Sequence, residues 1–169
     1  MSHHLEVTNL ILANATYLRE LELLNVLEQH RIFCKHDMAH FLDVARIAML
    51  LCQEEQIPAD PDVIYSAALL HDIGRTEEYQ HHIPHDLASV HKAESILEEI
   101  ACEETKKQKI LNLIRHHRHP DHPNQDPALL ESIESIFYRA DKKSRLCFCC
   151  PACSQCNWTQ DKKNMQIER

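Results

Sequence analysis

The stretch that most constrains this chain is residues 67–75, where an apolar run ends in a histidine and an aspartate. His71 and Asp72 follow Leu70 at once, and Gly74, the only glycine among 169 residues, stands two positions later. A glycine is free to adopt a positive φ, which ends a helix and turns the chain away. We therefore predict a buried helix over residues 60–73, with the His-Asp pair at its C-terminal end and Gly74 as its stop.

An ionised aspartate in an apolar setting needs a partner or a cation to offset its desolvation. A metal ion bound by His71 and Asp72 would meet that need, since imidazole and carboxylate are both metal-ligand groups. The alternative is a capped helix end with a solvated aspartate, and a single His-Asp pair does not decide between the two.

Length and composition favour one domain of residues 1–146 followed by a short appendix of residues 147–169. The net charge is −8, with 18 basic against 26 acidic residues, so no basic face for nucleic acid is expected. No apolar run is long enough to span a membrane, and no export leader is apparent. We expect a cytoplasmic protein in which bound cations attract any anionic substrate.

The fold class indicated by the hydrophobic periodicity is all-α, a bundle of about six helices. Besides the helix of residues 60–73, helices are expected over residues 8–29, 37–56, 86–100, 106–117 and 126–141. The helices of residues 60–73 and 126–141 each start at an Asp-Pro pair, which combines a capping side chain with a residue suited to the first helical position. The polar residues 75–84 are expected to form a loop at the mouth of a site.

Two further polar side chains fall on apolar helical stripes. His40 is expected on the core side of the helix of residues 37–56, either as a ligand or as a hydrogen-bonded core histidine. Asp141 follows the stripe of the last helix, although an exposed acid paired with a lysine would look the same. His36, one turn before His40, is expected beside the site or at the surface.

Together these residues form an H…HD…D pattern, which resembles the HD superfamily of metal-dependent phosphohydrolases over roughly residues 30–146. The segments around His40, around His71-Asp72 and around Asp141 resemble the first, central and last motifs of that family. The resemblance is nearest to small stand-alone bacterial HD proteins, which include diadenosine tetraphosphate hydrolases. It implies an HD-type helical domain with a metal centre.

Members with two metals have two more histidines between the HD pair and the last aspartate. His85 fits the first of these positions better than His91, and His117 fits the second better than His116. The resemblance then implies a metal set whose central carboxylate, Asp72, bridges both ions; the set is His40, His71, Asp72, His85, His117 and Asp141.

The basic residues Arg75 and Lys142 stand next to ligand positions, where they could contact a phosphate or form ordinary salt bridges.

The implied cofactor is one or two divalent transition metals, since imidazoles and carboxylates suit Fe, Mn, Co, Ni or Zn. Two such ions can generate hydroxide at neutral pH and hold both oxygens of a phosphate displacement. The function we expect is hydrolysis of a nucleotide or another small phosphate ester. A di-iron oxygenase and a metal- or nucleotide-binding module without turnover are the alternatives, and the sequence gives neither the substrate nor the oligomeric state.

The appendix contains a run of cysteines at C-x2-C-x2-C-x2-C spacing, formed by Cys147, Cys150, Cys153 and Cys156. Thiolates this close in sequence suit a tetrahedral zinc or an iron–sulfur cluster better than disulfides, whose geometry so short a loop cannot satisfy twice. A reduced, metal-free tail is the alternative.

Overall fold

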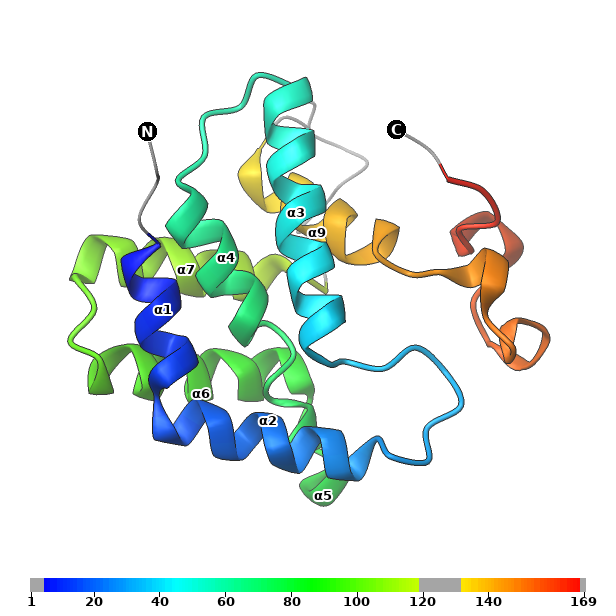
Figure 1. The fold of residues 1–169 in the computed structure, drawn as a ribbon, viewed down its shortest axis with the longest axis horizontal. Helices are drawn as coiled ribbons and strands as arrows, with labels where there is room; N and C mark the ends of the chain where they lie inside the picture. Colours follow the sequence, from blue (N-terminus) through cyan, green and yellow to red (C-terminus); the bar gives the residue numbers. More distant parts are fainter. Residues whose placement is uncertain (1–4, 119–131, 168–169) are drawn as a thin grey trace.

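The computed structural model describes residues 5–118 and 132–167, and within these ranges all regular structure is helical (Figure 1). The all-α prediction is confirmed. The α-helices are α1 (Glu6–Ala13), α2 (Ala15–Leu27), α3 (Met38–Glu54), α4 (Pro61–Leu70), α5 (Arg75–His81), α6 (His85–Glu99), α7 (Glu104–His116) and α9 (Ile133–Lys143).

Helix α4 is the centre of the fold, and it packs against α1, α3 and α7. Its residues Val63, Ile64, Ala67, Ala68, Leu69 and Leu70 are all buried. A helix that is apolar all round is stable only when other elements cover every face, which is why the other helices surround it. Helix α3 also packs along α9, and α6 packs along α7. These contacts bring the end of α4 close to helices that are distant in sequence.

Several helix starts follow the capping signals in the sequence. Asp37 caps α3 by accepting a hydrogen bond from the backbone of His40, and Asp60 caps α4 in the same manner ahead of Pro61. The expected helix over residues 60–73 ends at Leu70, and residues 71–74 form a tight turn. His71 and Asp72 thus follow the C-terminal end of α4 directly.

The expected single helix over residues 8–29 is wrong. The chain breaks at Asn14, whose extended backbone and side chain cap α2 by accepting a hydrogen bond from Tyr17. Residues 75–84 are not simply a loop, because residues 75–81 form α5. This helix is polar and half-exposed, so no apolar stripe marks it, but Glu77 and Glu78 in its first turn suit the helix dipole. The described residues therefore hold more helices than the six expected.

The helix that carries Asp141 begins later than expected. Its described start is Ile133, where Ser132 caps the helix by accepting a hydrogen bond from the backbone of Ser135. The predicted start at the Asp126-Pro127 pair lies outside the described residues.

Gly74 does not have the positive φ that the sequence suggested. Its φ is −75° and its ψ is −3°, an ordinary right-handed conformation that any residue adopts. Gly74 lies instead against the first turn of α6, where an added Cβ would lie 2.2 Å from the backbone nitrogen of Ser89. The glycine is needed for the close approach of two backbones.

Left-handed residues follow three of the described helices, α3, α5 and α6, and none of them is glycine. Gln56 after α3 has φ 57° and Ala101 after α6 has φ 53°, each inside a Schellman motif closed by Ile57 N–H to Cys52 C=O or by Cys102 N–H to Leu97 C=O. We predict that Gln56→Gly and Ala101→Gly each raise the free energy of unfolding by about 0.5–1 kcal/mol, because relief of left-handed strain outweighs the added unfolded-state entropy. Urea denaturation measures this.

The control for that prediction is Ser95→Gly within the right-handed part of α6, which should lower stability. A loss of stability in both Schellman variants would contradict the prediction.

The appendix follows the end of α9, and its described residues 147–167 contain short 3-10 turns at Cys147–Cys149, Cys153–Gln155 and Gln160–Lys162. Asn164 fastens it by donating hydrogen bonds from its side-chain amide to the carbonyls of Lys142 and Arg145. Nothing in the described ranges is a helix long and apolar enough to cross a membrane.

Candidate metal centre

Four predicted site residues converge beside the end of α4. One ligand atom each from His40, His71, Asp72 and Asp141 lies within 4.8 Å of the others, and all four side chains are buried. The Nε2 atom of His71 is 3.2 Å from Asp72 Oδ2, and that of His40 is 3.6 Å from the same oxygen and 3.4 Å from Asp141 Oδ1. These residues come from α3, the α4–α5 turn and α9.

A second group shares Asp72. His85 Nε2 and His117 Nε2 lie 3.5 and 3.8 Å from Asp72 Oδ1, the other oxygen of the carboxylate. The three side chains are buried and form a second cluster of potential ligands. His85 is the first residue of α6 and His117 follows α7 directly. The two oxygens of Asp72 therefore face two different sets of histidines.

The rival histidines lie elsewhere. His91 is exposed on α6, and the Nδ1 of His116 is 2.8 Å from the carbonyl of Asn112 in the preceding turn. Neither belongs to a group of three or more clustered ligand atoms among the described residues.

Each clustered histidine is held by its Nδ1 atom, which leaves Nε2 directed at the carboxylates. Backbone carbonyls of Ala68 and Ile114 hold His71 and His117, at 2.8 and 2.6 Å. Ser144 Oγ lies 3.1 Å from the Nδ1 of His40, and Glu78 holds His85 at 2.9 Å. An N–H donated from Nδ1 fixes the ring and leaves the Nε2 lone pair free, as in most histidine metal ligands.

The donor set fits a metal. The Nε2 atoms of His40, His71 and His117 and the Oδ2 of Asp72 are buried and make no hydrogen bond to any described residue. Buried polar atoms without partners are costly, and four of them directed at one place are the arrangement a cation would satisfy. Imidazole nitrogens and carboxylates suit divalent transition metals.

Charge around the site keeps both aspartates ionised. Burial alone would raise the pKa of Asp72, but the positive charges of Arg75 and His71 outweigh it and hold the pKa well below its usual range. The pKa of Asp141 is likewise low despite burial, because His71, Lys142 and Arg145 lie against it. Burial would lower the pKa of His71, yet the charges of Asp72 and Asp141 raise it to about 9. Burial and the nearby charge of His71 lower the pKa of His117 to about 3.

These values predict proton release on metal binding. The metal-free protein holds a proton on His71 up to about pH 9, whereas His117 is already neutral. A metal must displace that proton, so binding of Mn²⁺, an ion that thiols bind poorly, should release about one proton at pH 7.5, and its apparent affinity should rise about tenfold per pH unit until pH 9. Calorimetry in buffers of different ionisation enthalpy measures the proton count, and binding without release would contradict this charge assignment.

The two basic residues expected to meet phosphate are paired with ligand carboxylates. Arg75 donates from Nε to Asp72 Oδ1 at 2.8 Å, and Lys142 Nζ lies 2.6 Å from Asp141 Oδ2. The guanidinium of Arg75 also lies 3.3 Å from Glu78. Both cations thus lie beside the site, and a phosphate role for them stays a prediction.

Sequence reasoning missed the residues that hold the ligands. Glu78 and Ser144 contact ligand histidines, and Arg145 donates to Asp141 Oδ1 at 3.0 Å. Glu28 and His36 also adjoin the cluster, with His36 Nε2 at 3.7 Å from Asp72 Oδ2. Only His36 had a signal in the sequence, its position one turn before His40. The remaining residues are polar and lie in segments whose sequence pattern does not indicate burial; they are Glu28, Glu78, Ser144 and Arg145.

The predicted cysteine ligands are not brought together with the same closeness. No cysteine belongs to a clustered group among the described residues, and all eight are free thiols. One thiol from another segment, Cys34 in the α2–α3 loop, interacts with the appendix. Burial raises the pKa of Cys34, Arg145 lowers it, and the thiols of Cys150 and Cys147 raise it further. Cys34 is therefore a further candidate in this region.

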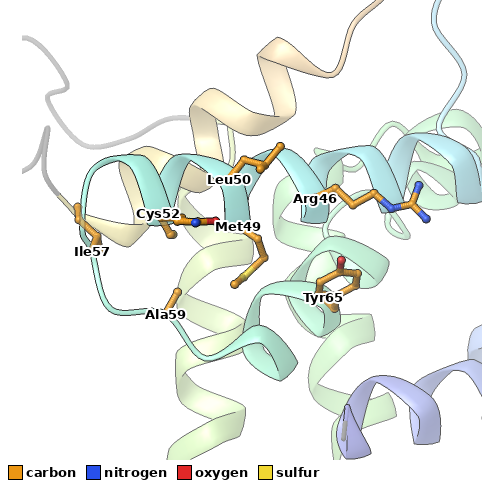
Figure 2. Close-up of a pocket in the computed structure, with 8 residues that line it drawn as sticks. Arg46, Met49, Leu50, Cys52, Ile57, Ala59 and Tyr65 are labelled. Carbon is orange, nitrogen blue, oxygen red and sulfur yellow. The ribbon is translucent and has the colours of Figure 1, made fainter. Parts of the chain in front are cut away.

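A surface groove lies away from this centre, between α3, the following loop and α4 (Figure 2). Its lining includes Arg46, Met49, Cys52, Ile57 and Tyr65, none of which is a residue of the His-Asp cluster. The groove therefore contributes nothing to the candidate centre.

Fold and site together define an all-helical protein built around a buried histidine–carboxylate centre. The chain belongs to the HD domain family, whose model matches residues 38–146. It is 38% identical over 159 residues to an uncharacterized protein of Clostridium beijerinckii, across 94% of this chain and 96% of that protein. No solved structure matches. The HD resemblance is confirmed, and it places the chain in a superfamily of metal-dependent phosphohydrolases; the relation to diadenosine tetraphosphate hydrolases stays a prediction.

Proposed function

We propose that this protein is a metal-dependent hydrolase of a nucleotide or another small phosphate ester. The observation that carries the proposal is the position of Asp72, whose two oxygens face separate histidine groups. One divalent ion would be held by His40, His71, Asp72 and Asp141. A second ion would be held by Asp72, His85 and His117. When bound, such ions lower the pKa of water and neutralise phosphate charge.

The chain's own residues prepare that chemistry. In the hydrolysis, a water oxygen bonds to phosphorus, the ester P–O bond breaks, and the leaving oxygen takes up a proton. The Nδ1 hydrogen bonds of the ligand histidines keep their Nε2 atoms in place without reorganisation. Arg75 and Lys142 add positive charge beside the site, so a phosphate can approach a protein of net charge −8.

A phosphate-release screen tests this function. The protein is loaded separately with Mn²⁺, Fe²⁺, Co²⁺, Ni²⁺ or Zn²⁺ and offered nucleotides and simple phosphate esters, with and without oxygen. We expect phosphate release that depends on metal and not on oxygen. Oxygen-dependent turnover without phosphate release would favour an HD-type oxygenase, and bound nucleotide without turnover would favour a binding module.

We also propose that the appendix binds a metal of its own through Cys147, Cys150, Cys153 and Cys156. The support is chemical: thiolates select Zn²⁺ or iron–sulfur clusters, whereas the His-Asp cluster takes harder ions, and the appendix has few buried apolar side chains to order it. Metal counting after anaerobic purification should show zinc or iron that the quadruple Cys→Ser variant lacks. A second variant, Cys34→Ser, shows whether the nearby thiol contributes.

The single tryptophan, Trp158, lies two residues after Cys156 and should report metal binding by its fluorescence. Equal metal content and equal fluorescence in the quadruple variant and the wild type would leave the cysteines as a reduced tail.

A further inference from the structure

His36 is a fifth buried histidine directed at Asp72, and it precedes residues 38–146, which the HD domain model matches. Its side chain is 3% exposed, and its Nε2 lies 3.7 Å from Asp72 Oδ2. Its ring lies edge-on to that of His40, with centroids 5.6 Å apart. His36 belongs to the α2–α3 loop, which swings out from the helices before α3 begins (Figure 1).

A buried carboxylate holds His36 in one orientation. One carboxylate oxygen of Glu28 accepts a hydrogen bond from the Nδ1 of His36 at 2.5 Å. The other oxygen accepts a hydrogen bond from the backbone N–H of His36 at 2.7 Å. The hydroxyl of Tyr79 donates to the same carboxylate at 2.5 Å. Glu28 is only 3% exposed, so it is tied to His36 and α5 rather than to water. A carboxylate that takes the Nδ1 proton fixes the tautomer whose Nε2 is an acceptor.

The distances argue against His36 as another metal ligand. Its Nε2 is not within 4.8 Å of every ligand atom in the cluster of His40, His71, Asp72 and Asp141. At 3.7 Å it is also too far from Asp72 for a hydrogen bond. The atom therefore lies just beyond the four ligands and faces whatever binds beside them. Because the Nδ1 of His36 is paired with Glu28, its Nε2 is an acceptor, so the partner of this atom must be a hydrogen-bond donor.

We propose that His36, positioned by Glu28 and Tyr79, accepts a hydrogen bond from the attacking water at the metal centre and orients it toward the phosphate. This inference rests on the proposed function for the identity of the substrate. The contact itself requires only that a water be bound beside His40 and Asp72. A neutral imidazole held by a carboxylate suits this role because its acceptor is fixed before the substrate arrives.

The test compares His36→Ala and Glu28→Gln with His81→Ala, a matched histidine that is exposed on α5. Each protein is loaded with Mn²⁺ and assayed on para-nitrophenyl phosphate. We expect metal content and KM of His36→Ala to equal those of the wild type, while kcat falls about a hundredfold. Glu28→Gln should lower kcat less, about tenfold, because the amide oxygen still accepts from Nδ1. His81→Ala should match the wild type.

A second measurement needs no substrate. In the Co²⁺-loaded protein, the absorption spectrum is followed against pH, and the midpoint of its change should fall by about one unit in His36→Ala, because the lost hydrogen bond stabilises the neutral water more than its deprotonated form. An unchanged midpoint would overturn the proposal, and so would loss of metal from His36→Ala, which would make His36 a ligand. Absence of phosphate release in the wild type would count against the proposed function alone, since the Co²⁺ spectrum still decides the role of His36.

Discussion

Replacement of Asp72 by alanine is expected to remove bound metal from both positions and to lower the hydrolysis of a phosphate ester by about a thousandfold or more. The reason is that Oδ2 of Asp72 faces His40 and His71 while Oδ1 faces His85 and His117. One substitution therefore takes a ligand from both groups. A bound metal contributes several kcal/mol of transition-state stabilisation, which corresponds to a loss of this size.

The helical content of Asp72→Ala should remain that of the wild type, because Asp72 lies in the turn after α4 and not within a helix. His85→Ala and His117→Ala should each lose less metal, since each imidazole belongs to one group only. Asp43→Ala is the control, as this carboxylate is 46% exposed on α3 and faces solvent. Metal analysis and circular dichroism give both readouts. Equal metal content in Asp72→Ala and the wild type would contradict the assignment of Asp72 as a metal ligand.

Replacement of Gly74 by alanine is expected to be among the most destabilising single-methyl additions in the chain. The new Cβ would lie 2.2 Å from Ser89 N, 2.6 Å from the carbonyl carbon of Ala88 and 2.6 Å from His85 O. All three are backbone atoms of α6, so no side chain can rotate to make room. We expect a loss of about 3 kcal/mol in the free energy of unfolding, the upper part of the usual range for overpacking.

The same substitution should also disturb metal binding selectively. Gly74 holds the first turn of α6 against the turn that contains Asp72, and displacement of α6 moves His85 away from Asp72. The second group should therefore lose metal before the first. Ser89→Ala is the control: it removes the hydrogen bond from Gly74 N–H to Ser89 Oγ without a clash, and should cost only about 1 kcal/mol. Wild-type stability in Gly74→Ala would show that the two backbones can separate freely.

The sequence was sufficient for the central helix and for the identity of the clustered residues. An apolar run that stops at His71-Asp72 requires burial on all sides, and α4 has it. The apolar stripe of α3 places His40 on the core side, and that of α9 does the same for Asp141. Such patterns are local, and local spacing decides which face of a helix a residue occupies.

What the sequence could not show depends on contacts between distant segments. Gly74 is needed because α6 approaches it, and neither its neighbours nor its own backbone conformation reveals that. Glu28, at the end of α2, binds His36 in the following loop and Tyr79 on α5, so its burial had no local sign. Helix α5 is polar on most sides and lacks the apolar period that marks a helix. The break at Asn14 depends on a single capping side chain.

The most direct test of the metal centre is anomalous diffraction from a crystal of the Mn²⁺-loaded protein. The structure predicts one peak among His40, His71, Asp72 and Asp141 and a second among Asp72, His85 and His117, with Asp72 contacting both. Two peaks that share Asp72 would establish the bridging role of this carboxylate. Full metal loading with no peak within bonding distance of Asp72 would contradict the assignment of the site.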